Sequence, residues 1–138
     1  MTSRFSELVL DCHDPKLVAG FWCAALGYKI IEESDEVVEI GPEDMPDGWT
    51  PELIAKWKER MRGAPPAPTI VFAPVPESKT VKNRVHIDVS PLGSQEEEVE
   101  RLIQLGATRA DVGQGDVRWV VMRDPEDNEF CVLRSLAP

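Results

Sequence analysis

Short segments with apolar residues at every second position alternate along this chain with segments in which apolar residues recur at helical spacing. Residues 5–12, FSELVLDC, alternate in this way, which predicts a half-buried strand. Asp14 and Pro15 then supply a helix cap and a first helical position, and Gly27 supplies the stop. Two more strands are expected at about residues 28–32 and 37–40.

The same order of elements returns in the second half of the chain. Residues 84–89, RVHIDV, alternate again, so His86 and Asp88 are predicted to share the strand face opposite Val85. Ser94 opens a capping box for the next helix. Further strands are expected near residues 108–112, 117–123 and 129–133.

Two helix-ending glycines give this repeat a register. Gly27 and Gly106 lie 79 residues apart (106 − 27). The same shift superposes Glu7 on His86, so these two side chains are predicted to occupy equivalent places in the two halves.

Residues 42–68 interrupt the first half. Thr50 and Pro51 begin a predicted helix over about 50–62, and Trp49 is placed to pack on Ile54 as a staple. This helix has an apolar face, and the favoured interpretation is that this face covers the edge of the sheet. Capping a groove and meeting a second subunit are the alternatives.

The repeat predicts an α+β fold made of two βαβββ modules in a single domain, residues 1–138. Module 1 spans about 4–76, with the helix at 50–62 inserted, and module 2 spans about 82–136. We expect the modules to pair about a pseudo-twofold axis, forming a cupped mixed sheet around a central groove with the helices outside.

Composition narrows the functional classes. The chain has 138 residues, 42% of them hydrophobic, and a net charge of −10 from 25 acidic and 15 basic residues. Because nucleic-acid binding needs a basic face, no nucleic-acid partner is expected. No apolar run approaches the roughly 20 residues that cross a bilayer, so we expect no membrane association and a cytoplasmic protein. Three cysteines without paired spacing predict reduced thiols.

Three segments, LVLDCHDPKLVAGFWCAALGY, KNRVHIDV and RWVVMRDPEDNEFCVL, resemble the glyoxalase-like domains of the vicinal oxygen chelate superfamily. That superfamily includes glyoxalase I, extradiol dioxygenases and bleomycin resistance proteins. The resemblance implies one metal ligand in the first strand and one in the last strand of each module. Carried over to this chain, the first-strand positions are Glu7 and His86. The last-strand positions are Ala73, which offers no ligand atom, and Cys131, where the family usually has glutamate.

This incomplete set predicts that no metal cofactor is required. If a metal is bound, Glu7 and His86 are its predicted ligands, and zinc, nickel, manganese or iron suits them. The groove residues expected to contact a ligand are Glu7, His86, Asp88, Trp119, Glu129 and Cys131. His86 is the best candidate for a catalytic base, with a hydrogen-bonded groove histidine as the alternative. For Glu7 a solvated carboxylate, and for Cys131 a small buried residue, are the simpler interpretations.

Three functions remain open. The favoured one is binding of a small organic ligand without a complete metal site, by a homodimer, as in the resistance proteins that the chain resembles. The second is a metal-dependent lyase, isomerase or dioxygenase. The third is a metal-free enzyme with His86 as base. Carboxylates beside aromatic walls predict a flat or hydrophobic ligand, cationic rather than anionic.

Overall fold

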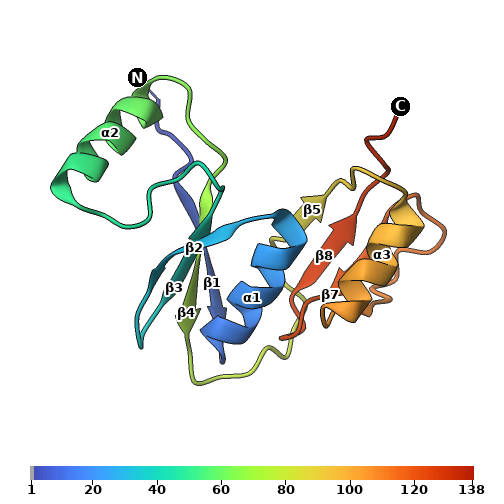
Figure 1. The fold of residues 1–138 in the computed structure, drawn as a ribbon. Coiled ribbons are helices and arrows are strands. Elements are labelled where there is room, and N and C mark those ends of the chain that lie inside the picture. The colour runs from blue at the N-terminus through green and yellow to red at the C-terminus, as the bar shows by residue number, and fades with distance from the viewer. Residues whose placement is uncertain (1) are drawn as a thin grey trace. The chain divides into compact units, whose positions relative to one another are not determined.

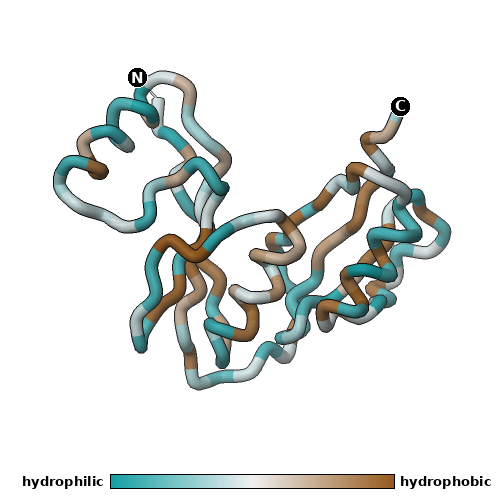
Figure 2. The backbone as a smooth tube through the Cα atoms, viewed as in Figure 1, coloured by the Kyte–Doolittle hydropathy of each residue, from teal (hydrophilic) through white to brown (hydrophobic). Residues whose placement is uncertain are grey.

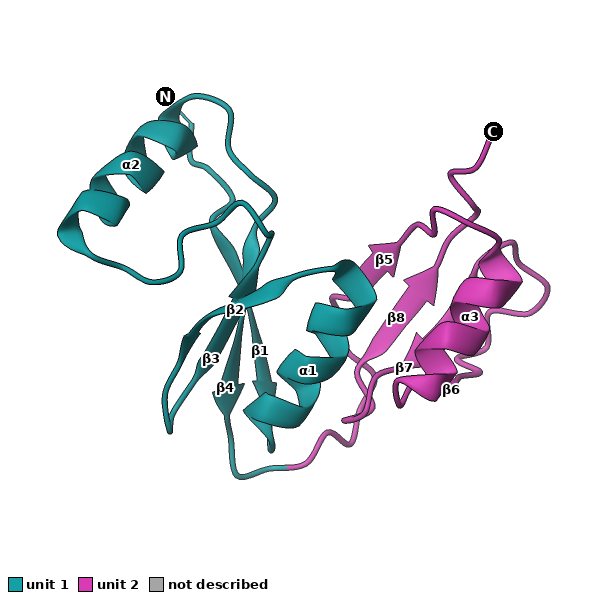
Figure 3. Cartoon of the chain, in the orientation of Figure 1, with its two compact units in different colours: residues 1–77 teal, residues 78–138 magenta. Residues whose placement is uncertain are grey.

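A computed structural model describes residues 2–138, and the chain divides into two compact units (Figure 3), Met1–Glu77 and Ser78–Pro138. Each unit holds one four-stranded mixed sheet and a helix that follows its first strand. The predicted α+β class is therefore confirmed, and so is the order strand, helix, three strands in each half. Within the described residues no helix combines the length and apolar character needed to cross a membrane.

Unit 1 begins with a strand and a long helix, and its second helix is inserted before the last strand (Figure 1). Its strand order is β1-β4-β3-β2, with β1 parallel to β4 and the other pairs antiparallel. The elements are β1 Glu7–Cys12, α1 Pro15–Leu26, β2 Lys29–Glu33, β3 Val38–Gly41, α2 Pro51–Arg62 and β4 Thr69–Pro74.

Local signals set both ends of α1. The Asp14 carboxylate accepts a hydrogen bond from the Leu17 amide at 3.2 Å, and Pro15 fills the first helical position, where a missing N–H costs nothing. Gly27 ends the helix with φ 68°, a left-handed conformation that glycine adopts without strain. The buried side of α1, which includes Trp22, packs against β3 and β4 and forms the core of unit 1.

The inserted helix α2 lies where the sequence predicts it and is fastened to the sheet of unit 1. Trp49 donates its indole N–H to the Glu39 carboxylate at 2.9 Å and packs edge-on against Trp57 at a centroid distance of 5.7 Å. The Thr69 hydroxyl donates to the other Glu39 oxygen at 2.9 Å. Glu39 is 8% exposed, so two neutral donors hold a buried carboxylate on β3. Through Trp49, that carboxylate anchors the start of the insertion.

Unit 2 has the same plan with shorter strands. Its strand order is β5-β8-β7-β6, with β5 parallel to β8 and the other pairs antiparallel. The elements are β5 Ile87–Val89, α3 Gln95–Gln104, β6 Thr108–Arg109, β7 Val120–Arg123 and β8 Glu129–Val132. The prediction of a strand over residues 84–89 was too long. Val85, predicted on the buried face, precedes the strand and is 72% exposed.

One face of the unit 2 sheet packs against α3. Phe130, Val132 and Met122 are fully buried, as are Val99 and Leu102 on the helix, which contacts β6 and β8. Figure 2 shows hydrophobic patches between hydrophilic stretches along α3. Successive strand residues point to opposite faces. The residues between the core positions therefore lie on the open face of this sheet.

The strand pairings show that the two alignments used for the repeat are inconsistent with each other. A shift of 79 matches Leu8 with Ile87, but Leu8 pairs with Ile70 whereas Ile87 pairs with Phe130. Matching Phe72 with Phe130, the alignment that makes Ala73 equivalent to Cys131, instead matches Leu10 with Ile87. The two alignments differ by two residues and cannot both hold. In either one the last-strand position in unit 1, Val71 or Ala73, lacks a ligand atom.

Candidate functional site

The open face of the unit 2 sheet is organised around three neighbouring positions. Asp88 on β5 pairs with Cys131 on β8, which pairs with Val121 on β7. Because Phe130 and Val132 point into the core, Cys131 between them points to the open face. The short alternating strands thus place a carboxylate, a thiol and an aliphatic side chain in one row across the sheet.

A cavity of about 490 Å³ lies over this row and is lined by residues of unit 2 alone. Its less polar lining residues are Val112, Trp119, Val121, Cys131 and Leu133. Its polar and charged lining residues are Lys82, His86, Asp88, Gln114 and Glu129. The largest apolar surface is Trp119, which remains 42% exposed.

Asp88 is the centre of the polar part of the cavity. His86 Nε2 lies 3.1 Å from Asp88 Oδ1, and both side chains are partly exposed. The Cys131 Sγ atom lies within 4.8 Å of a carboxylate oxygen of Asp88. Burial raises the pKa of this thiol, and the nearby Asp88 charge and hydrogen bond raise it further, with Lys82 acting in the opposite direction. Cys131 is therefore a neutral thiol at physiological pH rather than a nucleophilic thiolate.

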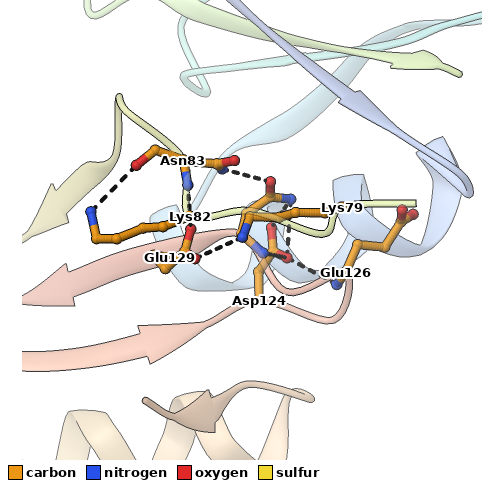
Figure 4. A network of polar contacts seen from close by, with 7 residues as sticks. Lys79, Lys82, Asn83, Asp124, Glu126 and Glu129 are labelled. Carbon is orange, nitrogen blue, oxygen red and sulfur yellow. Dashed lines mark hydrogen bonds and ion pairs between the residues drawn. The ribbon is translucent and has the colours of Figure 1, made fainter. Parts of the chain in front are cut away.

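Glu129 lies in the same cavity but is held by partners on the segment that precedes β5 (Figure 4). Lys79 Nζ donates to Glu129 Oε1 at 2.7 Å, and the backbone N–H of Asn83 donates to Oε2 at 3.1 Å. Burial by itself raises the pKa of this carboxyl. The hydrogen bonds from Lys79 and Asn83 and the Lys79 charge outweigh burial, so the pKa lies below its ordinary value. Both oxygens are occupied, and Glu129 is a structural carboxylate in this site.

A turn after β7 supports that network. Asp124 accepts hydrogen bonds from the amides of Glu126 and Asn128 at 2.9 and 3.0 Å, and Asp127 takes a left-handed conformation with φ 65°. The Asn128 side chain donates to Asp124 and accepts from the Asn83 side chain at 2.9 Å. The DPEDN turn thus fixes the start of β8 and the approach to β5 together, before any ligand is present.

Five of the six ligand-contact residues predicted from the sequence, His86, Asp88, Trp119, Glu129 and Cys131, line this one cavity. Glu7 does not line it: this exposed residue begins β1 in unit 1. Sequence reasoning did not select Lys82 or Gln114. A signal for Gln114 was present, since Gly113 and Gly115 on either side both have positive φ and shape the loop that presents it.

The metal implied by the resemblance can be tested against the donors of this site. One ligand atom from each of His86, Asp88 and Cys131 lies within 4.8 Å of the other two. Donors around one tetrahedral zinc ion lie about 3–4 Å apart, so modest movements of these side chains would bring the three atoms onto one ion. Nitrogen, oxygen and sulfur together suit zinc better than manganese, which prefers oxygen ligands. The three residues fit a metal, although with a different ligand set from the predicted pair Glu7 and His86.

The fold and this cavity define an α+β protein of two βαβββ units with a small-molecule-sized cavity on an open sheet face. The chain belongs to the glyoxalase-like domain family, whose model matches residues 7–133. The resemblance seen in the sequence is thereby confirmed. A comparison with curated protein sequences found no match.

Solved structures with the same fold come from several bacteria. A glyoxalase/bleomycin resistance protein/dioxygenase family enzyme from Burkholderia phytofirmans PsJN is 16% identical, with 94% of this chain and 97% of that chain covered and a TM-score of 0.62. The fosfomycin resistance protein FosX from Mesorhizobium loti is 11% identical, with 96% and 92% covered and a TM-score of 0.62. FosX from Listeria monocytogenes, complexed with Mn(II) and sulfate, is 16% identical, with 98% and 92% covered and a TM-score of 0.62. At these identities the likeness shows the fold alone.

Proposed function

We propose that this protein binds a small organic molecule in the cavity on the open face of the unit 2 sheet. The observation that carries the proposal is the cavity itself, about 490 Å³, which combines apolar lining residues with His86 and Asp88 at 3.1 Å from each other. Ligand sites of proteins typically enclose about 300–1,000 Å³ and combine apolar walls with a few placed polar groups. The predicted flat or hydrophobic ligand fits these walls.

Each part of the wall has a role in this proposal. Trp119 offers a flat surface for an aromatic or unsaturated ligand body, since a partly exposed indole gains from being covered. Asp88 accepts a hydrogen bond from the ligand while it orients His86. When His86 donates through Nε2 to Asp88, its Nδ1 is the nitrogen that remains to accept a proton. His86 thus stays the predicted base if the protein is an enzyme.

Thermal-shift and calorimetric titration with a panel of flat aromatic compounds tests the proposal. A ligand that binds only the folded state raises the melting temperature. Trp119→Ala is expected to weaken binding by about tenfold or more, because stacking and apolar burial are lost. Leu92→Ala is the matched control, since Leu92 lies in the same unit, is 83% exposed and does not line the cavity. Equal weakening by both substitutions, or none by either, would contradict the proposal.

The alternative is a metal-dependent lyase, isomerase or dioxygenase, and one observation favours it: the three grouped donors His86, Asp88 and Cys131. A divalent metal bound there would supply Lewis-acid polarisation of a substrate oxygen. The three side chains would hold the ion, and Trp119 would position the substrate. Elemental analysis after dialysis decides between the two functions. About one equivalent of zinc, nickel, manganese or iron, lost in His86→Ala and retained in Glu7→Ala, would support the metal enzyme.

Three further expectations remain predictions. The homodimer follows from the resemblance to paired resistance proteins, and light scattering coupled to gel filtration measures it directly. The cytoplasmic location and the participation of Glu7 in the same site as His86 are likewise predictions. Comparing ligand affinity in Glu7→Gln with that of the unsubstituted protein tests the participation of Glu7.

A further inference from the structure

A second cavity of about 470 Å³ adjoins the first in unit 2. Trp119 and Leu133 line both cavities, so the two share a wall. The second cavity is also lined by Arg118, Arg134 and Ser135. A molecule lying against Trp119 in the first cavity therefore has a neighbouring space with two arginines at its border.

These two arginines have no protein partner for their charge. Within residues 2–138, neither the Arg118 nor the Arg134 guanidinium makes an ion pair or a hydrogen bond. The chain carries 25 acidic residues against 15 basic ones, so carboxylate partners are abundant elsewhere. Two like charges bordering one cavity repel each other, and an anion between them relieves that repulsion.

The backbone that carries the two arginines is held together by one side chain. Gln95 Nε2, in the first turn of α3, lies 3.0 Å from the Arg118 carbonyl and 3.0 Å from the Leu133 carbonyl. A single nitrogen thus ties the approach to β7 to the end of β8. Arg118 lies two residues before the paired start of β7 at Val120, and Arg134 lies two residues after the paired end of β8 at Val132. The arginine positions are preorganised, although their side chains are free to adjust.

We propose that Arg118 and Arg134 bind an oxyanion, a carboxylate or a phosphate-like group, at one end of a ligand whose flat apolar body lies against Trp119. The inference rests on the proposed function of the first cavity and names its ligand class: an amphipathic organic anion. A guanidinium presents a fork of N–H donors that matches the two oxygens of a carboxylate or phosphate. An overall charge of −10 repels anions at long range, so recognition has to come from a local pair of this kind.

This inference replaces the expectation of a cationic ligand. That expectation counted Glu129 among the free carboxylates of the groove, but Lys79 and Asn83 occupy both of its oxygens. Asp88 is engaged by His86, and Lys82 lines the same cavity. The net attraction for a cation is therefore small, whereas the positive charge at Arg118 and Arg134 is unopposed.

Probes that share one ring and differ in one group test the anion site. The set is 2-naphthylacetate, the uncharged 2-naphthylacetamide and 2-naphthylmethylphosphonate, each titrated calorimetrically at low and high salt. We expect the two anions to bind about tenfold or more tightly than the amide, since hydrogen bonds to charged groups are the strong ones. Added salt should reduce that preference. The carboxylate and phosphonate arms then show which oxyanion the pair prefers.

Variants assign the preference to the two arginines. In the double variant Arg118→Ala/Arg134→Ala the anions should bind no more tightly than the amide, while amide binding is unchanged. Arg118→Lys/Arg134→Lys keeps the positive charge but loses the forked N–H donors of the guanidinium group, so it should retain part of the preference for anions. It replaces the alanine variant in the test if that variant does not fold. Arg84→Ala/Arg109→Ala is the charge-matched control, because both arginines lie in unit 2 and border neither cavity.

The outcomes separate the two proposals. Equal binding of anion and amide, or a preference that survives both double variants, overturns the anion site and leaves ligand binding at Trp119 intact. Failure of every probe to bind overturns the proposed function and this inference with it. Loss of amide binding in the arginine variants would show that the substitutions disturb the first cavity, and would count against a separate anion subsite.

Discussion

Replacing Lys79 by methionine tests whether the partly buried ion pair with Glu129 stabilises unit 2. The Lys79 side chain is 17% exposed and the Glu129 side chain 5%, with 2.7 Å between Nζ and Oε1. At an effective dielectric constant of about 20, charges at this separation attract by about 6 kcal/mol before desolvation is subtracted. Removing one partner of a buried pair typically costs about 3–5 kcal/mol. Because the Asn83 amide still satisfies one Glu129 oxygen, we expect a loss of about 2–4 kcal/mol in the free energy of unfolding.

The direction in which this stability loss changes with pH can also be predicted. The pKa of Glu129 in the folded protein lies below its ordinary value of 4.5. Its contribution to stability is therefore fully present above pH 4.5 and is lost as the pH falls through the lower folded-state pKa. In Lys79→Met the main cause of the lowering is removed, so Glu129 protonates at higher pH. The difference in stability between the two proteins should consequently be largest near neutral pH and shrink below about pH 4.5.

Urea denaturation followed by tryptophan fluorescence, at pH 7.5 and near pH 4, measures both quantities. Lys82→Met is the control, because it removes a lysine charge from the same segment before β5, whereas Lys82 Nζ donates to the Asn83 carbonyl at 3.3 Å and, within residues 2–138, forms no ion pair. We expect the control to lose less than about 0.5 kcal/mol. A loss in Lys79→Met as small as in the control, or one that is unchanged between the two pH values, would refute the reasoning.

Three further predictions concern other parts of unit 2. Gln95→Ala should lower the free energy of unfolding by about 1–3 kcal/mol in urea titrations, because it removes the donor shared by the Arg118, Val132 and Leu133 carbonyls. A loss no larger than that of Gln104→Ala, at the other end of α3, would contradict this prediction. Asp88→Asn should lower the pKa of the Cys131 thiol and speed its alkylation by iodoacetamide at pH 8, measured peptide by peptide, since the Asp88 charge raises that pKa; an unchanged rate would show that burial alone controls it. Dialysed protein should contain well below one equivalent of divalent metal in a four-ligand protein site, because unit 1 has no ligand atom at its last-strand position. Plasma mass spectrometry measures the metal content, and a full equivalent whose binding requires Glu7 would contradict this prediction.

The helix starts were predictable because each is decided within a few residues. Asp14, Thr50 and Ser94 each accept a hydrogen bond from the amide three positions later, as their residue types and neighbours indicate. Strand faces were predictable for the same reason, and alternation placed His86 and Asp88 together. The length of β5 was not predictable, since a strand ends where its neighbour stops pairing.

The charge of the site depended on distant partners and so escaped sequence reasoning. Glu129 pairs with Lys79, 50 residues earlier, and no local pattern links the two. The sequence pattern also left the register between the repeats ambiguous, because a slip of two residues keeps every side chain on its face and leaves the alternation unchanged. Only the pairing of Ile87 with Phe130 exposes the inconsistency. Local chemistry thus predicted which residues face the cavity, but not which of them remain available to a ligand.

Strand β8 limits which residues of this cavity can be substituted without disturbing the sheet. All four of its residues are buried, with Phe130 and Val132 in the core and Glu129 and Cys131 in the cavity. A substitution there that alters ligand preference also alters the packing or the ion pair that holds the sheet. Trp119 and Gln114 line the same cavity but are less buried than the β8 residues. Descendants of this chain that acquire new ligands should therefore change first along residues 112–119, while β8 keeps its sequence.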